Sequence, residues 1–471
     1  DVGTLSLHGI GDTRFTSKNG DIRGNGTLSA AGDVTLTAAR VYPTSLSSFS
    51  VFAYEHADGE GSVTIRSSGS AVGLPLSAGG SLSIHASHIH QNGVLQAPLG
   101  SITLGWDGRD LDPSDTDLDS PYNIIAGSSV SAPVTSTLTL SNKSVTSVSA
   151  AGAKDTDWVI PYGISPDGQT WIDPRGVNVT LSGMPEKTVR ISGESVNMGS
   201  GAVVDIRGGG DLLASRWKPG TGGSVDILGS ASASWASGTE YQAGELVSFG
   251  GATWSARVRH SGQSPTVGLY WTKVAESYAI VPQSAIGYLP YNAFNTGGKA
   301  NLLGGDPGFT GGVSVGDTVT LEGSGLLEAG TYVLLPSRYA LLPGAFLVTP
   351  KSGTSTAGSV KTADGSWIVK GSRGNSLNGD SGLTPLLGRY EITSSEILAT
   401  RASYEKFSAN TFIAAASKNQ KGGSAQTSPD DAGHAAFHGN SSLRLAGKLL
   451  TDSPGRGASV DVSSFSDIRV T

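Results

Sequence analysis

The sequence predicts an all-β protein built mainly as a parallel β-helix. The first observation is a recurring pattern, in which a glycine-led turn precedes a short run alternating small or apolar residues with polar ones. The second is spacing, because the starts at Gly80 and Gly100, and those at Gly176 and Gly193, lie roughly one 20-residue rung apart. The third is composition. Glycine accounts for 67 of 471 residues and charged residues for 15%, which indicates many turns and few ion pairs.

Residues 1–230 are predicted to form the first rungs, with loops between them. In a stacked coil, inward Val, Ile, Leu and Ala side chains form ladders, while outward Ser, Thr and Asn side chains meet water. The same alternation permits antiparallel sandwiches, but the rung spacing favours the β-helix. The clearest candidate strands are 26–30, 32–38, 61–66, 80–86 and 100–105.

Residues 231–275 are predicted to be an inserted module. Three of the eight tryptophans, Trp235, Trp254 and Trp271, fall within this short span. The flanking segments 223–228 and 278–282 read as one continuous passage when the span is removed. Such an abrupt change between continuous flanks is typical of a domain inserted into a surface loop.

Residues 276–471 are predicted to continue the β-helix. Within them, 313–348 should be β but should stand outside the coil as a lobe, because Pro336 and Pro343 interrupt the rung pattern.

Several stretches together resemble filamentous haemagglutinin-type exoproteins, the large adhesins of bacterial two-partner secretion. They are 86–105, 144–150, 160–163, 210–214, 219–224, 278–282 and 330–345. The resemblance implies a right-handed β-helix and a non-catalytic adhesive segment that mediates attachment to surfaces, cells or glycans, in a biofilm or on a host. It also implies a secreted or bacterial cell-surface location and an outer-membrane secretion partner for the full-length protein. We therefore expect the chain, which begins at Asp1, to be a piece of a longer precursor.

The inserted span resembles the type-3 chitin-binding modules of bacterial chitinases. The resemblance implies a surface for glycans or exopolysaccharide, because flat aromatic rings stack on the apolar face of a sugar. The span departs from the family at 256–260, where paired exposed tryptophans are commonly found and this chain has Ala-Arg-Val-Arg-His. The alternative is that the large aromatics only form the core of a small module. The predicted carbohydrate-binding residues are Trp235, Tyr241, Trp254, Arg259, Tyr270 and Trp271.

Two further groups of residues suggest metal ions. The acidic stretch 107–119 offers Asp110, Asp112, Asp115 and Asp117 as oxygen ligands for Ca²⁺, although it lacks the EF-hand spacing and also suits a solvated loop. His85, His88 and His90 lie close together, as Zn²⁺ would need, but they occupy an ordinary rung. No cofactor is expected apart from Ca²⁺.

Several function classes are disfavoured by the sequence. The net charge of −7 is spread along the chain, so no basic face is available for nucleic acid. No apolar run is long enough for a membrane span. The candidate strands are nearly free of carboxylates, and no familiar catalytic motif is present, so we expect no enzyme. Two alternatives stay open: a carbohydrate-active β-helix enzyme with an accessory binding module, and the receptor-binding portion of a contact-dependent toxin carrier.

Overall fold

The computed structural model divides the chain into two compact units. Unit 1 comprises Asp1–Asp155, Ser182–Asp211 and Ala425–Thr471, and unit 2 comprises Thr156–Leu181 and Leu212–Ser424. Both units are rich in β-strands, as predicted. The structure describes residues 4–54, 60–69, 74–108, 133–151, 161–164, 168–173, 178–218, 220, 226–228, 233–250, 252–274, 276–282, 313, 316–352, 358–375, 387–419 and 426–465.

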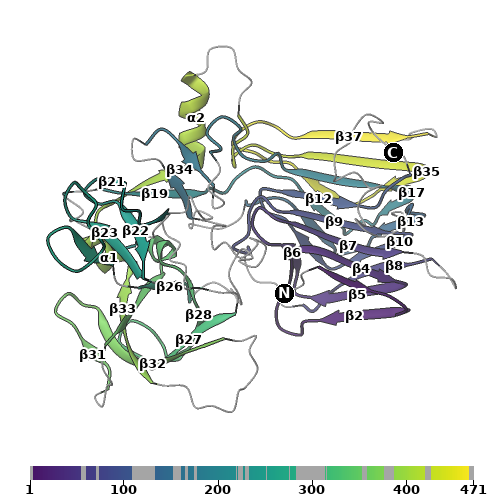
Figure 1. The fold of residues 1–471 in the computed structure, drawn as a ribbon. Helices are drawn as coiled ribbons and strands as arrows, with labels where there is room; N and C mark the ends of the chain where they lie inside the picture. Colours follow the sequence, from purple (N-terminus) through teal and green to yellow (C-terminus); the bar gives the residue numbers. More distant parts are fainter. Residues whose placement is uncertain are drawn as a thin grey trace. The chain divides into compact units, whose positions relative to one another are not determined.

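Unit 1 is built from parallel strands that stack in three columns (Figure 1). The first column contains β1 (Leu5–Leu7), β4 (Gly26–Ala31), β7 (Ser48–Tyr54), β9 (Ser81–Ala86), β12 (Ser101–Leu104), β17 (Thr188–Met198), β35 (His434–Leu445) and β37 (Ser459–Ser464). The second contains β2 (Asp12–Thr16), β5 (Asp33–Ala38), β8 (Ser62–Ser67), β10 (His88–Asn92) and β13 (Thr137–Leu140). The third contains β3 (Ile22–Gly24), β6 (Val41–Pro43), β11 (Val94–Gln96), β14 (Val145–Ser147), β18 (Val203–Asp205) and β36 (Lys448–Leu450).

Two long strands belong to two columns at once. The first half of β17 pairs with β12 and its second half pairs with β13. Strand β35 follows β17 along this course, with a register irregularity between Gly193 and Ser195. The chain therefore visits the columns in a fixed order, as in the successive strands β4, β5 and β6 or β9, β10 and β11.

Register explains why these residues form strands. Leu28, Val51, Ile84 and Leu104 stand at equivalent positions of neighbouring strands in the first column, and each is almost completely buried. Burying each such side chain contributes about 1.5–3 kcal/mol relative to leaving it exposed. The alternation in the sequence thus places an aliphatic ladder inside and Ser or Thr residues outside.

The predicted rung spacing is right for one glycine pair and wrong for the other. Gly80 and Gly100 lead strands β9 and β12, which pair in register from Ser81 and Ser101. A Cβ atom on Gly100 would lie 2.0 Å from the carbonyl oxygen of Gly80, so the stacked turns admit no side chain there. By contrast, residues 178–181 belong to unit 2 and form no strand of the three columns.

Unit 2 contains one large antiparallel sheet and smaller sheets, two of which include a parallel pair. The largest contains β26 (Tyr278–Ile280), β27 (Asp317–Leu321), β28 (Gly330–Val333), β29 (Leu335–Pro336), β30 (Phe346–Lys351), β31 (Val360–Lys361), β32 (Trp367–Asn375) and β33 (Gly388–Ser394). The 3-10 helix η3 (Ser337–Leu341) and helix α1 (Ser395–Arg401) accompany this sheet. A smaller sheet contains β15 (Pro161–Ile164), β16 (Trp171–Ile172), β19 (Leu213–Trp217) and β34 (Tyr404–Ser408), and helix α2 (Ala409–Asn419) follows it.

The structure changes the predicted boundaries of the last segment. Strand β26 was predicted to belong to the coil, but it pairs antiparallel with β29 and β30. The lobe predicted for 313–348 is therefore part of a wider antiparallel sheet, and the strand columns of unit 1 resume only at β35. Alternation with period 2 indicates a strand, but it does not say which neighbour the strand pairs with.

Candidate functional site

The predicted inserted module forms two small sheets inside unit 2. One contains β20 (Ala233–Ser234), β22 (Leu246–Phe249), β23 (Ala252–Ala256) and β25 (Trp271–Lys273), and the other contains β21 (Glu240–Tyr241) and β24 (His260–Ser261). Four residues form its core, namely Tyr241, Val247, Ala256 and Trp271.

Two of the predicted sugar-contacting residues lie in this core. Tyr241 is 5% exposed and Trp271 is 1% exposed. Their rings meet edge to face with centroids 5.2 Å apart. Trp271 Nε1 donates to the Gln263 carbonyl at 2.8 Å, and the Tyr241 hydroxyl accepts from Ala236 N at 2.7 Å. We therefore assign both side chains to the module's stability, since neither ring offers a face to a sugar.

Trp235 and Trp254 lie at the margin of the core, partly buried against it. Trp235 meets the exposed ring of Phe249 edge to face at 5.4 Å. Trp254 Nε1 donates to the Phe249 carbonyl at 3.1 Å. These two tryptophans therefore combine a packing role with an edge that reaches the surface.

A separate apolar surface lies on the loops that follow β23 and precede β25. It consists of Val258, Val267, Leu269 and Tyr270, which are 40%, 77%, 69% and 37% exposed, and we call it the 258–270 patch. Arg257 joins the two loops, because its backbone N–H donates to Tyr270 O and its Nη1 donates to Gly268 O, both at 2.8 Å.

The Tyr270 ring is braced by the neighbouring ring of His260. The two ring centroids are 5.3 Å apart, and His260 in turn meets Trp271 edge to face at 4.7 Å. His260 Nδ1 lies 2.8 Å from the Val258 carbonyl oxygen. The exposed tyrosine is thus tied to the module's core through one buried imidazole.

A charged pair, Arg259 and Glu240, lies beside this patch, because Arg259 directly follows Val258. Arg259, another predicted contact residue, donates to the Glu240 carboxylate at 3.0 Å, and Gln242 donates to the same carboxylate at 3.0 Å. The hydrogen bond from Arg259 lowers the pKa of Glu240. The carboxylate therefore stays ionised, and the Arg259–Glu240 pair offers both donors and acceptors to hydroxyl groups.

Val258, Val267 and Leu269 were not predicted as site residues. The sequence-based prediction selected aromatic and charged residues, because side chains of these types commonly contact sugars. The sequence did offer one signal. Two apolar residues, Val267 and Leu269, stand on either side of Gly268, where a turn would usually have polar residues.

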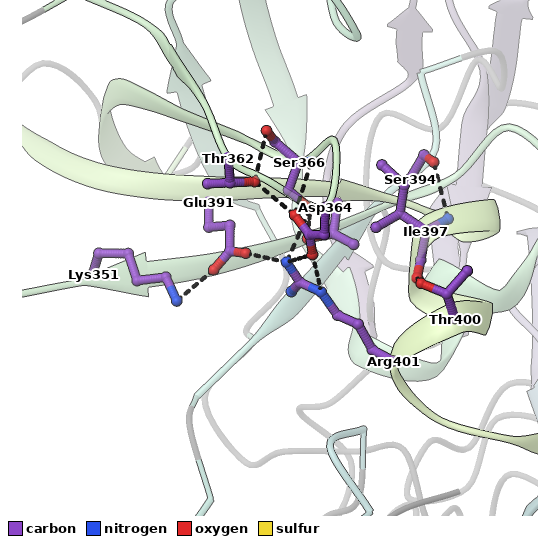
Figure 2. Close-up of polar contacts among 10 residues, drawn as sticks. Lys351, Thr362, Asp364, Ser366, Glu391, Ser394, Ile397, Thr400 and Arg401 are labelled. Carbon is purple, nitrogen blue, oxygen red and sulfur yellow. Dashed lines mark hydrogen bonds and ion pairs between the residues drawn. The ribbon is translucent and has the colours of Figure 1, made fainter.

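Unit 2 also contains a cluster of charged side chains on β30, β33 and α1 (Figure 2). Arg401, at the end of α1, contacts both Glu391 and Asp364, and its Nε donates to Asp364 at 2.7 Å. Lys351 forms an ion pair with Glu391 from the other side. Thr362 donates to Asp364 at 2.6 Å.

Both carboxylates in this cluster are held in the ionised form. Hydrogen bonds from Thr362 and then Arg401 place the pKa of Asp364 far below its usual value. Burial opposes ionisation of Glu391, but hydrogen bonds from Lys351 and Arg401 outweigh it and lower its pKa. The cluster ties the end of α1 to the sheet.

The predicted Ca²⁺ ligands Asp110, Asp112, Asp115 and Asp117 lie outside the described residues. Among the described residues, no group of three His, Cys, Asp or Glu side chains is arranged to hold a metal ion.

The three histidines considered for Zn²⁺ have different surroundings. His85 is buried and stacks on Phe52 with centroids 5.0 Å apart. His88 contacts Thr137 Oγ1 at 2.8 Å and Glu60 at 2.7 Å, whereas His90 is exposed.

Within the ranges that the structure describes, no helix combines the length and the apolar character needed to cross a bilayer. Comparisons with protein-family models, curated protein sequences and solved structures found no match to this chain.

Proposed function

We propose that this chain is a segment of a large exported bacterial adhesin that attaches to glycans or exopolysaccharide and carries out no catalysis. The full-length protein would reach the cell surface or medium through an outer-membrane secretion partner. The support is the resemblance of several rung-like stretches to filamentous haemagglutinin-type exoproteins, together with parallel strand columns in which apolar side chains form ladders.

We infer further that unit 1 is a right-handed parallel β-helix. The support is the repeated visit to three columns in one order, with parallel pairing throughout. Connections between parallel strands of a sheet are right-handed in nearly all proteins, because of the twist of the strands. A crystal structure with a left-handed coil in unit 1 would refute this assignment.

The observation that carries the glycan proposal is the 258–270 patch. A monomeric protein exposes few adjoining apolar side chains without a function, and this patch places a braced tyrosine ring beside two highly exposed aliphatic residues. The neighbouring Arg259–Glu240 pair adds hydrogen-bonding groups at an exposed position. Such an apolar centre with nearby polar groups suits a sugar ring.

A non-catalytic role is supported by the charged cluster of Figure 2. A general acid for glycoside cleavage needs a carboxyl group that keeps its proton near neutral pH. Asp364 and Glu391 have the opposite property, because Arg401 contacts both and both pKa values are lowered. The cluster therefore suits a structural role better than proton transfer.

The proposal is tested by pull-down of the full 471-residue chain with chitin, peptidoglycan and bacterial exopolysaccharide. We expect retention on at least one polymer. Tyr270→Ser should weaken retention about tenfold, because it removes the ring's apolar contact with the sugar, and a tenfold change corresponds to about 1.4 kcal/mol.

The matched control is Val360→Ser, which removes another exposed apolar side chain of unit 2 outside the module. It should leave retention unchanged. The glycan proposal fails if wild-type protein is retained on none of the polymers, or if both variants behave as wild type does.

A further inference from the structure

Three cations form a row across neighbouring strands of the large sheet in unit 2. Arg389 on β33 is directly opposite Lys351 on β30 and directly opposite Lys370 on β32. Residues directly opposite in antiparallel pairs point to the same face of the sheet, with Cβ atoms about 4.5–5.5 Å apart. Lys351, Arg389 and Lys370 therefore stand side by side on one face, and we call them the cation row.

Like charges placed directly opposite one another destabilise a sheet unless something compensates them. Lys351 is compensated by its ion pair with Glu391. Among the described residues, Arg389 and Lys370 form no ion pair and no side-chain hydrogen bond. The Arg389 Nε atom is buried and has no hydrogen-bond partner there.

The surrounding charges do not neutralise the row. Glu391 already contacts both Lys351 and Arg401, and Asp364 already contacts Arg401. Glu322 also counts, because the register of β27 and β32 places it opposite Lys370, and these groups together with the row give four cations against three carboxylates. Glu322 follows β27 and donates its backbone N–H to Lys370 O, but its side chain forms no ion pair with Lys370 within the described residues. An excess of one positive charge is left, and Arg389 is a member of the row that forms no ion pair among the described residues.

We propose that the cation row is a binding site for the carboxylate groups of an acidic polysaccharide, such as a uronate polymer. The guanidinium fork of Arg389 matches a planar carboxylate, and the two lysines supply point charges on either side. The buried Arg389 Nε atom, which has no partner among the described residues, is a donor that a bound carboxylate would satisfy. This site is distinct from the 258–270 patch and does not depend on it.

Spacing and position favour a polysaccharide over other polyanions. Neighbouring strands are about 4.8 Å apart, so the row is about 10 Å long with one cation per strand. Nucleic acid carries a phosphate every 3.4 Å or so along each strand and is bound through larger basic faces. An extended peptide usually binds by pairing with a free strand edge, but β33 is paired on both sides, with β30 and β32.

The experiment is calorimetric titration of the full chain with oligogalacturonate at low salt. Wild-type protein should bind, and added salt should weaken the binding because the contacts are ionic. Arg389→Gln should lower the affinity about tenfold or more, and Arg389→Gln with Lys370→Gln should abolish measurable binding.

Lys361→Gln is the matched control, because Lys361 is an exposed lysine on β31 outside the row. It should bind as wild type does, and so should Tyr270→Ser, which tests the other site. Thermal unfolding checks the fold. The row variants should melt at or above the wild-type temperature, because they remove uncompensated like charges.

The proposal is overturned if wild-type protein does not bind oligogalacturonate, or if the row variants bind as well as Lys361→Gln does. It is also overturned if polyglutamate or a DNA oligonucleotide of equal charge binds as tightly as oligogalacturonate, because the site would then respond to charge alone.

Discussion

At the scale of single residues, His85 shows how burial changes the chemistry of a side chain. It stands on β9 opposite Phe52 of β7, and the two rings stack nearly parallel, with an interplanar angle of 7°. Its Nδ1 is buried without a hydrogen-bond partner among the described residues. Burial lowers the pKa of His85 to about 4, so the imidazole is neutral in the folded chain at ordinary pH.

This shift predicts a loss of stability in acid. The unfolded chain binds the proton near the ordinary histidine pKa of about 6.5, whereas the folded chain does so near 4. Above about pH 6.5 neither state is protonated and no penalty exists, and the penalty grows as the pH falls from 6.5 towards 4. At about pH 4.5 it should reach on the order of 2–3 kcal/mol.

The measurement is hydrogen exchange of the β7 and β9 peptides at about pH 7 and about pH 4.5, corrected for intrinsic exchange rates. His85→Phe, which keeps a ring against Phe52, should lose this part of the pH dependence. Equal pH dependence in the variant and the wild type would show that His85 is not the group responsible.

At the scale of elements, a buried ion pair connects η3 and β34 in unit 2. Arg338 of η3 donates to Asp226 at 2.7 Å, and the Tyr404 hydroxyl of β34 donates to the same carboxylate at 2.6 Å. The guanidinium also lies over the Tyr404 ring, 5.3 Å from its centroid. The side chains of Arg338 and Asp226 are only 3% and 8% exposed, so water cannot replace either partner.

Removing one partner should therefore destabilise unit 2 strongly. Asp226→Ala should cost about 3–5 kcal/mol, because it leaves the Arg338 charge buried and unpaired. The double variant Asp226→Leu with Arg338→Met should recover much of this loss, because it removes both charges. Urea unfolding followed by tryptophan fluorescence measures the effect, since seven of the eight tryptophans belong to unit 2. A double variant no more stable than Asp226→Ala would contradict the account.

The sequence predicted some of these elements better than others. The segments led by Gly80 and Gly100 pair as expected, because alternation and spacing both carry information about a repeated rung. Strand β26 was assigned to the coil wrongly, because its alternation is equally compatible with antiparallel neighbours. Local pattern predicts strands, whereas pairing depends on residues distant in the sequence.

The candidate sites show the same limit. The tryptophan-rich span was recognised as a module, but whether Trp271 or Tyr270 faces solvent depends on strand register, which the sequence does not reveal. The cation row could not be predicted from the sequence, for a related reason. Its members Lys351, Lys370 and Arg389 are widely separated in the sequence and meet only through the pairing of three strands.

At the scale of the whole molecule, unit 2 interrupts unit 1 twice and unit 1 resumes each time. The chain leaves unit 1 after Asp211 and returns to it at Ala425. The departing and returning segments are hydrogen-bonded to each other, from Gly209 N to Pro429 O at 2.9 Å and from Gly433 N to Ile206 O at 2.8 Å. The ends of this long excursion are thus fixed close together by unit 1 itself.

Replacing residues 212–424 by a short Gly/Ser linker should therefore leave the strand columns of unit 1 folded. Surface excursions with neighbouring ends are replaced at little cost in stability. Circular dichroism and resistance to protease measure the outcome. Deleting 434–445, which removes β35, should instead expose the β17 ladder and cause proteolysis. Equal sensitivity of both deletions would show that unit 1 depends on unit 2.

The pairing of β17 with β35 also favours one order of events during folding. Ser195 and Ser442 are hydrogen-bonded although 247 positions separate them in the sequence. Closing so long a loop in an unfolded chain carries an entropy cost that rises by about 0.6 kcal/mol for each doubling of its length. Near the two ends of the excursion, β19 pairs with β34, with Leu213 opposite Ser408. Once the excursion has folded, the loop that remains to be closed is therefore far shorter. Substitutions that destabilise unit 2 would then delay the docking of β35. Unit 1 would stay incompletely folded for longer, although every contact in its final folded state would be unchanged.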